Sequence, residues 1–233
     1  GVYQQVSTYY YAHLQYLLGN DAIATTYFED LKNAVHYKKI VPQYLLHIYH
    51  RKGDYSYVIK EGEDVLQSTD SKRKSDIAQL LADAWYKNGD FAKAIQYYNI
   101  AGTYGRKQLA RDDHYQKGIS HFNLEQYPES IIHLEQVAAS DDDALAQNAA
   151  YHLGLAYNET NQTTFARNAF LKAHRLGFDP IIAEDALFSY AKLSMETSPV
   201  PYNEAVSLLE NYLENATTQT KKNEANQLIV QLY

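Results

Sequence analysis

The sequence has 233 residues, of which 45% are hydrophobic and 21% are charged, and its net charge is −7. These proportions are those of an ordinary globular protein. An acidic chain without a basic stripe is poorly suited to gripping phosphates, so we expect no nucleic-acid partner. The absence of cysteine excludes disulfides, zinc–thiolate sites and a thiol nucleophile. No apolar run approaches the roughly 18 residues that a transmembrane helix needs, so the sequence predicts no transmembrane segment in this chain.

Along the chain, a small or medium apolar residue recurs inside helical patterns at intervals of 34 to 37 residues. The recurring positions are Ala12, Leu46, Ala82, Gly118, Gly154 and Ala191. Such a period predicts helical hairpins that stack in series, because each hairpin buries its apolar face only against its neighbours. We therefore expect an all-α fold with a single solenoid domain over residues 1–233. Its six hairpins are predicted over approximately 5–37, 39–72, 75–109, 111–144, 147–180 and 184–217, followed by a cap helix over 219–233.

The second helix of each predicted hairpin repeats a small residue followed by a large one four positions later. The small member would let two helices approach closely, and the large member would fill the gap between hairpins. The pairs are Ala24 and Phe28, Ala94 and Tyr98, Ser130 and Leu134, Ala166 and Phe170, and Ala205 and Leu209. The second hairpin departs from this rule with Val58 and Gly62, so we expect looser packing there.

Turn signals separate the two helices of each hairpin. Gly19-Asn20, Gly53-Asp54 and Gly89-Asp90 predict a left-handed glycine at the end of the first helix and a polar cap on the second. In the fourth hairpin, Pro128 suits the first position of the second helix instead. The sixth hairpin has a longer predicted turn over 197–201. The basic triplet within 70–75 is interpreted as a solvated linker between hairpins.

The segment 150–180 carries the most specific motif. Leu153-Gly154 is followed by Tyr157, and Ala166 by Phe170, with Ala173 and Pro180 closing the unit. In this pattern the chain resembles the tetratricopeptide repeat (TPR) family, whose first helix carries L-G-x2-Y and whose second carries A-x3-F. The resemblance implies a right-handed α-α superhelix that acts as a non-enzymatic protein-interaction scaffold. The chain is also similar to bacterial TPR proteins of cell-envelope assembly, which implies a periplasmic or cell-envelope location, with the cytoplasm as the alternative.

The sequence contains no recognisable catalytic motif. H-E-x-x-H, G-x-S-x-G, the phosphate-binding P-loop and G-x-G-x-x-G are all absent, so we expect no enzymatic activity and no cofactor. His47 and His50 have the i, i+3 spacing of a shared metal site. No carboxylate on that helix completes a ligand set, and two polar rings facing a groove are the favoured interpretation.

The resemblance to TPR proteins also implies which residues line a groove formed by the first helices. Tyrosine suits such a surface because it supplies a large contact area with a polar tip. We therefore expect an extended peptide or an amphipathic helix to bind there. The set that chaperone-binding relatives use for a carboxylate is not reproduced, since Gln43, His47, Gln79 and Asp83 stand in its place. The predicted groove residues are Tyr9, His13, Tyr16, His47, His50, Tyr86, Tyr115, Phe122, Tyr151, Asn158 and Phe188.

Glycan binding is the alternative function, because tyrosine rings also stack on sugars. Some bacterial surface proteins bind glycans with a TPR-like helical frame. They place the sugar on long loops outside the repeats, and this sequence predicts almost no such loops.

Overall fold

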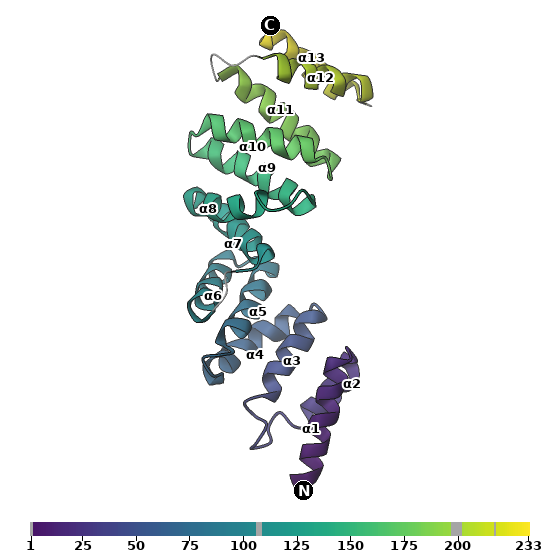
Figure 1. Ribbon diagram of the computed structural model, residues 1–233, viewed down its shortest axis with the longest axis vertical. Coiled ribbons are helices and arrows are strands. Elements are labelled where there is room, and N and C mark those ends of the chain that lie inside the picture. The colour runs from purple at the N-terminus through teal and green to yellow at the C-terminus, as the bar shows by residue number, and fades with distance from the viewer. Residues whose placement is uncertain (1, 106–108, 197–201, 217) are drawn as a thin grey trace. The chain divides into compact units, whose positions relative to one another are not determined.

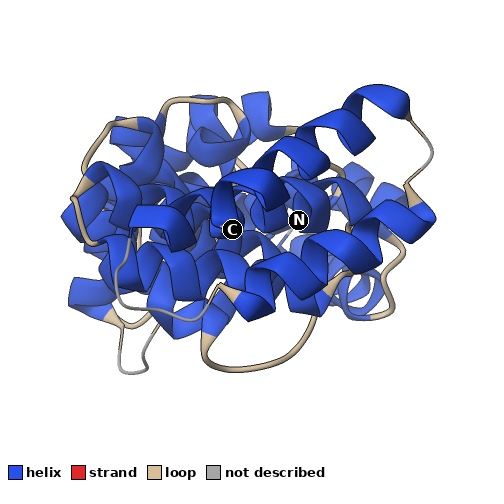
Figure 2. Cartoon of the chain, turned by 90° about the horizontal axis from the view of Figure 1, so that it is seen from above, coloured by secondary structure: helices blue, strands red, loops and turns tan. Residues whose placement is uncertain are grey.

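The computed structural model of the protein describes residues 2–105, 109–196, 202–216 and 218–233. The described part of the chain consists of helices joined by loops and turns (Figure 2). The expected all-α class is confirmed. The described residues form thirteen helices, α1 (Val2–Leu17), α2 (Asp21–Glu29), α3 (Val41–Arg51), α4 (Tyr55–Ser68), α5 (Lys74–Lys87), α6 (Phe91–Tyr104), α7 (Arg111–Asn123), α8 (Tyr127–Ala138), α9 (Ala144–Glu159), α10 (Thr163–Leu176), α11 (Pro180–Glu196), α12 (Asn203–Asn215) and α13 (Gln219–Leu232).

Consecutive helices pair into hairpins, such as α9 with α10 (Figure 1). The chain forms two compact units, Gly1–Leu109 and Ala110–Tyr233. Unit 1 contains α1 to α6, and unit 2 contains α7 to α13. The predicted single solenoid domain stays a prediction. Within the described residues, no helix is both long enough and apolar enough to span a membrane.

The recurring small position lies where the two helices of a hairpin meet. Ala12, Leu46, Ala82 and Ala191 are completely buried, and Gly118 and Gly154 are buried as well. A Cβ atom added to Gly154 would lie 2.7 Å from the ring of Phe170 in the paired helix. Real Cβ atoms do not approach so closely, so this position requires glycine. The recurrence at intervals of 34 to 37 residues therefore reflects the close packing of the two helices within each hairpin.

The small–large pairs of the second helices are also buried, as predicted. The large members Phe28, Tyr98, Leu134 and Leu209 are completely inaccessible to solvent, and Phe170 is 2% exposed. The expectation of looser packing at the second hairpin is wrong. A Cβ atom on Gly62 would lie 2.6 Å from Leu81 Cδ2, so the absent side chain makes room for a leucine of the next hairpin.

The predicted turn chemistry is largely confirmed. Gly19, Gly53 and Gly89 have φ angles of 76°, 76° and 81°. Asp54 and Asp90 each cap the following helix by accepting a hydrogen bond of 3.1 Å from a backbone N–H. Pro128 lies in the first turn of α8. The predicted long turn at 197–201 lies outside the described residues.

The first hairpin departs from the predicted turn and length. Asn20 does not cap α2, because its side chain donates to Gln15 Oε1 at 2.7 Å. Helix α2 ends at Glu29, and the chain continues through a series of turns to Ile40. Leu31 anchors this segment in the core with 3% exposure, and Tyr37 stacks on Tyr9 with 4.9 Å between ring centroids. The predicted extent of this hairpin thus includes a stretch that is not helical.

Two residues other than glycine adopt the left-handed conformation where a hairpin turns, Glu125 with φ 58° and Asn161 with φ 57°. Glutamate is strained in this region, whereas asparagine tolerates it. We expect Glu125→Gly to raise the free energy of unfolding by about 0.5–1 kcal/mol, measured by chemical denaturation. Asn161→Gly is the matched control and should give a smaller gain. An equal or larger gain at Asn161 would contradict the assignment of strain to Glu125.

Candidate partner-binding surface

Six of the predicted groove residues lie on the first helices of unit 1. Tyr9, His13 and Tyr16 come from α1, His47 and His50 from α3, and Tyr86 from α5. The α1 residues form an aromatic cluster with Tyr44 of α3. The ring centroids of Tyr16 and Tyr44 are 5.0 Å apart, and those of His13 and Tyr44 are 5.2 Å apart. These rings are half-buried, so they pack against the core and also present an edge to the surface.

A pocket of about 190 Å³ opens beside this aromatic cluster. It is bounded by side chains of α1, α3 and the first turn of α5, and it contains two of the predicted groove residues. Its walls combine aromatic rings with an amide, an imidazole and charges of both signs. The lining residues are Tyr16, Gln43, Tyr44, His47, Arg73, Asp76 and Ile77.

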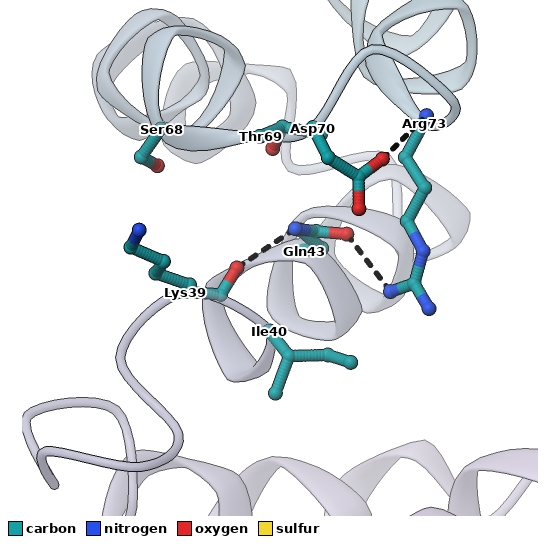
Figure 3. Close-up of a pocket in the computed structure, with 7 residues that line it drawn as sticks. All are labelled: Lys39, Ile40, Gln43, Ser68, Thr69, Asp70 and Arg73. Carbon is teal, nitrogen blue, oxygen red and sulfur yellow. Dashed lines mark hydrogen bonds between the residues drawn. The ribbon is translucent and has the colours of Figure 1, made fainter.

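A second pocket, of about 380 Å³, shares Gln43 and Arg73 with the first. Figure 3 shows Lys39 and Arg73 on either side of Gln43, with Asp70 beside Arg73. Ile40, Ser68 and Thr69 complete the lining. The two pockets therefore meet at one amide and one guanidinium.

Gln43 is held in place from both ends of its amide. Its Nε2 donates to the Lys39 carbonyl at 2.7 Å, and its Oε1 accepts from Arg73 Nη1 at 3.2 Å (Figure 3). The side chain is 8% exposed. A guanidinium has five N–H donors, of which this bond uses one. Arg73 is exposed, and its guanidinium has donors that suit a carboxylate or carbonyl of a partner.

Burial favours the neutral imidazole of His47. Burial lowers the pKa of His47, and the nearby Asp76 opposes that shift only partly. A neutral imidazole offers one donor and one acceptor, which suits a peptide group better than a second cation would. Burial also raises the pKa of Tyr86, so its phenol stays protonated. The fixed charges of the two pockets are therefore Lys39 and Arg73 against Asp70 and Asp76.

His50 makes an internal contact. Its Nε2 lies 2.5 Å from Asp83 Oδ2, which joins α3 to α5. The carboxylate partner that the sequence of α3 lacks thus comes from the next hairpin, 33 residues away. The described part of the chain contains no cluster of three or more histidine and acidic side chains arranged to hold a metal ion. His50 therefore positions two first helices relative to each other.

The five predicted groove residues of unit 2 differ in their contacts and in their exposure. Phe122 stacks edge-on against His152 of α9 at 5.3 Å. Tyr151 donates its hydroxyl hydrogen to Asp185, and burial together with this bond raises its pKa to about 12. Tyr115 is half-buried and Asn158 is exposed. Their role in binding stays a prediction.

The placement of Phe188 at the groove surface is wrong. This side chain is 3% exposed and packs edge-on against Tyr212 of α12 with 5.5 Å between ring centroids. Lys221 of α13 covers its ring at 4.9 Å. The last helix therefore covers Phe188, which the TPR resemblance had placed on the groove surface.

Sequence reasoning missed the cations of this surface. Arg73 belongs to the basic triplet interpreted as a solvated linker, and this exposed side chain also lines both pockets of unit 1. Lys39 lies in the turns before α3, at the first residue of the predicted second hairpin, and was not among the predicted groove residues. A further pocket, of about 510 Å³, lies in unit 2 beside α10, where no groove residue was predicted. It is lined by Asp142, Asn168, Leu171, Lys172, Arg175 and Leu176.

Comparison with solved structures identifies the architecture. YrrB, a TPR protein with an unusual peptide-binding site, superposes with a TM-score of 0.65 at 13% identity, over 86% of this chain and 97% of YrrB. MamA AMB-1 gives 0.64 at 15% identity, over 76% of this chain and 93% of its own. The C-terminal part of a TPR repeat-containing protein from Cytophaga hutchinsonii gives 0.58 at 21% identity, over 96% and 95%. The chain has the TPR fold.

At these identities the likeness is one of fold. No family model matches the sequence, and no curated protein matches it either. In TPR terms, the two pockets of unit 1 lie on and beside the first helices α1, α3 and α5, the helices from which the groove residues were predicted.

Proposed function

We propose that this TPR chain is a non-enzymatic interaction scaffold that binds a peptide segment, extended or helical, along the first helices of unit 1. The observation that carries the proposal is the junction of two pockets at Gln43 and Arg73, next to the predicted groove residues Tyr16 and His47. TPR structures such as YrrB, which has a peptide-binding site, support the general role. The cell-envelope location expected from the sequence belongs to the same proposal, and fractionation of cells that express the full-length protein tests it.

The lining of the pockets indicates the chemistry of the peptide. The rings of Tyr16 and Tyr44 favour an aromatic or aliphatic side chain, because they bury area at little entropic cost. Arg73 and Lys39 favour an acceptor group a short distance away. We therefore expect the preferred peptide to carry an apolar residue near an aspartate, a glutamate or a free carboxylate.

Peptide binding is favoured over glycan binding by where the pockets lie. The smaller pocket is lined by residues of α1, α3 and α5 and by Arg73 next to α5, and the larger one by residues at the ends of α3 and α4 and in the turns next to them. A peptide array and a glycan array probed in parallel with the purified chain separate the two functions. Capture of peptides alone would support the proposal, and capture of glycans alone would replace it with the alternative.

Arg73→Ala is expected to weaken binding of a captured peptide at least about tenfold, because truncating a charged group at the centre of an interface costs on the order of 1–3 kcal/mol. The dissociation constant is measured by isothermal titration calorimetry. Lys60→Ala is the matched control, since Lys60 is an exposed cation on α4 of the same unit. His47→Ala should also weaken binding. Unchanged affinity in both pocket variants would reject this surface.

A further inference from the structure

Four cations of unit 1 gather at the larger of its two pockets. Lys39 and Arg73 line this pocket, and Lys38 and Lys72 are their neighbours in the chain. All four are exposed. Gln43 connects the two pairs, because its amide is bonded to the backbone of Lys39 and to the guanidinium of Arg73 (Figure 3). These four residues are called the basic patch below.

The basic patch forms no ion pair with a carboxylate in the described part of the chain. Other cations of unit 1 do form such pairs, Arg51 with Asp21 and Lys93 with Asp90. The protein has 28 acidic residues for 21 lysines and arginines, so acids for pairing are in excess. Cations that stand together without acids create a positive potential at that place, although the net charge of the chain is −7.

Asp70 is the acidic residue that lines the larger pocket, and its carboxylate is engaged by the backbone. Its Oδ1 accepts hydrogen bonds from the N–H groups of Lys72 at 3.0 Å and Arg73 at 3.2 Å. Next to the basic patch, α3 and α5 begin without a side-chain cap, whereas Asp54 and Asp90 cap α4 and α6. The partial positive charge of two helix starts therefore adds to that of the basic patch.

The shape of the site favours a peptide over a flat anionic surface. The larger pocket has a volume of about 380 Å³ and meets the aromatic pocket at Gln43 and Arg73. A peptide across both pockets can place carboxylates beside Lys39 and Arg73 while an apolar side chain contacts Tyr16 and Tyr44. A membrane surface would contact the exposed cations but would leave the aromatic pocket unused.

We propose that the ligand of this surface is an acidic peptide segment, in which two or more aspartate or glutamate residues stand beside the apolar residue. This ligand class rests on the proposed function, whose peptide it specifies. Lys38 and Lys72 are chain neighbours of pocket residues, and neighbouring Cα atoms are about 3.8 Å apart. Charges act over roughly 8–10 Å at physiological salt. These two lysines therefore attract the segment from the edge of the site and act mainly on the rate of association.

The peptides that the purified chain captures on the array are the probes. Each is synthesised again with every Asp and Glu replaced by Asn and Gln, and both forms are titrated into the full chain at about 50 mM and 200 mM NaCl. We expect the captured peptides to carry the acidic cluster. The neutral form should bind at least about tenfold more weakly, and the acidic form alone should lose affinity as the salt concentration rises.

Lys72→Glu tests the basic patch on the protein itself. It should slow association of the acidic peptide about three- to tenfold in stopped-flow measurements, because a charge that attracts the segment becomes one that repels it. Lys38→Glu, on the other segment of the patch, should act in the same direction. Lys60→Glu is the matched control, since Lys60 is an exposed cation on α4 of the same unit and its replacement changes the net charge equally. Circular dichroism checks that each variant remains helical.

The possible outcomes separate this ligand class from the proposed function. An array that captures no peptide would reject both. Captured peptides without an acidic cluster, or neutral forms that bind equally well, would overturn the acidic ligand alone. Equal effects of Lys72→Glu and Lys60→Glu would also overturn it, because the net charge would then explain them. Binding to phosphatidylserine-containing vesicles that Lys72→Glu abolishes, without any preference between the two peptide forms, would assign the basic patch to a membrane instead.

Discussion

Gly154→Ala is expected to lower the free energy of unfolding by about 1–3 kcal/mol, the usual cost of forcing an extra group into a packed core. The added Cβ would lie 2.7–2.8 Å from three ring atoms of Phe170. That ring is 2% exposed, so it has no free space into which to move. The loss should exceed the roughly 1 kcal/mol that alanine gains over glycine inside a helix. Urea denaturation followed by circular dichroism measures the difference.

Gly102→Ala provides the control for this helix-propensity gain. Gly102 lies in α6, and a Cβ added to it would meet no atom within 4 Å. This variant should be more stable than the wild type by up to about 1 kcal/mol. The account of close approach at Gly154 fails if both glycines respond to alanine in the same direction.

The second large effect is a loss of stability on acidification that depends on three histidines between α7 and α8. Nδ1 of His114 lies 3.1 Å from Nδ1 of His133, and the ring of His121 stacks on His133 at 5.7 Å. A hydrogen bond between two ring nitrogens requires one of them to be an acceptor, so this pair is not doubly protonated. His121 is 8% exposed and its Nδ1 is bonded to Gln126 Oε1 at 2.7 Å.

Burial lowers the pKa of His133 most, and together with the nearby Lys117 and the two other histidines it brings this pKa to about 4. Burial also lowers the pKa values of His114 and His121, and at His121 the hydrogen bond to Gln126 is the main effect that opposes the shift. The folded pKa of His133 lies below the unfolded value of about 6.5. The contribution of this residue to the free energy of unfolding is therefore fully present above that pH. It is lost as the pH falls towards 4. We expect a loss of about 2–3 kcal/mol across this window from His133.

His133→Gln should reduce this loss, because a neutral amide replaces the group that must take up a proton. The free energy of unfolding, measured at intervals from pH 7 to pH 4, is compared between the variant and the wild type, so that the contribution of carboxylates cancels. His36→Gln, at an exposed position between α2 and α3, is the control and should leave the pH dependence unchanged. Parallel curves for His133→Gln and the wild type would contradict the assignment.

The repeat pattern predicted those parts of the fold that depend on contacts between residues close in sequence. The pairing of Gly154 with Phe170 joins positions 16 residues apart, and both belong to the motif. Gly53 and Asp54 likewise specify their turn through local backbone chemistry. At these positions the residue type itself favours the local conformation or the close contact, so the sequence predicts this part of the structure.

The candidate site was less predictable because its contacts join different hairpins. His50 meets Asp83 across 33 residues, and Arg73 meets Gln43 across 30. The repeat pattern specifies single positions within a hairpin, so it does not predict which residues of two different hairpins contact each other. Phe188 followed the first-helix pattern but is covered by α12 and α13, whose packing the pattern does not specify. Glu125 adopts the left-handed conformation although it is not a glycine, so the sequence gives no glycine signal for that turn.

The most direct test of the binding surface is hydrogen exchange of the chain with and without a peptide captured on the array. Binding at the pockets predicts slower exchange in α3 and in the first turns of α5, around Gln43, His47 and Arg73, with little change in α10. Protection confined to the pocket beside α10, or protection of unit 2 alone, would contradict the proposed site.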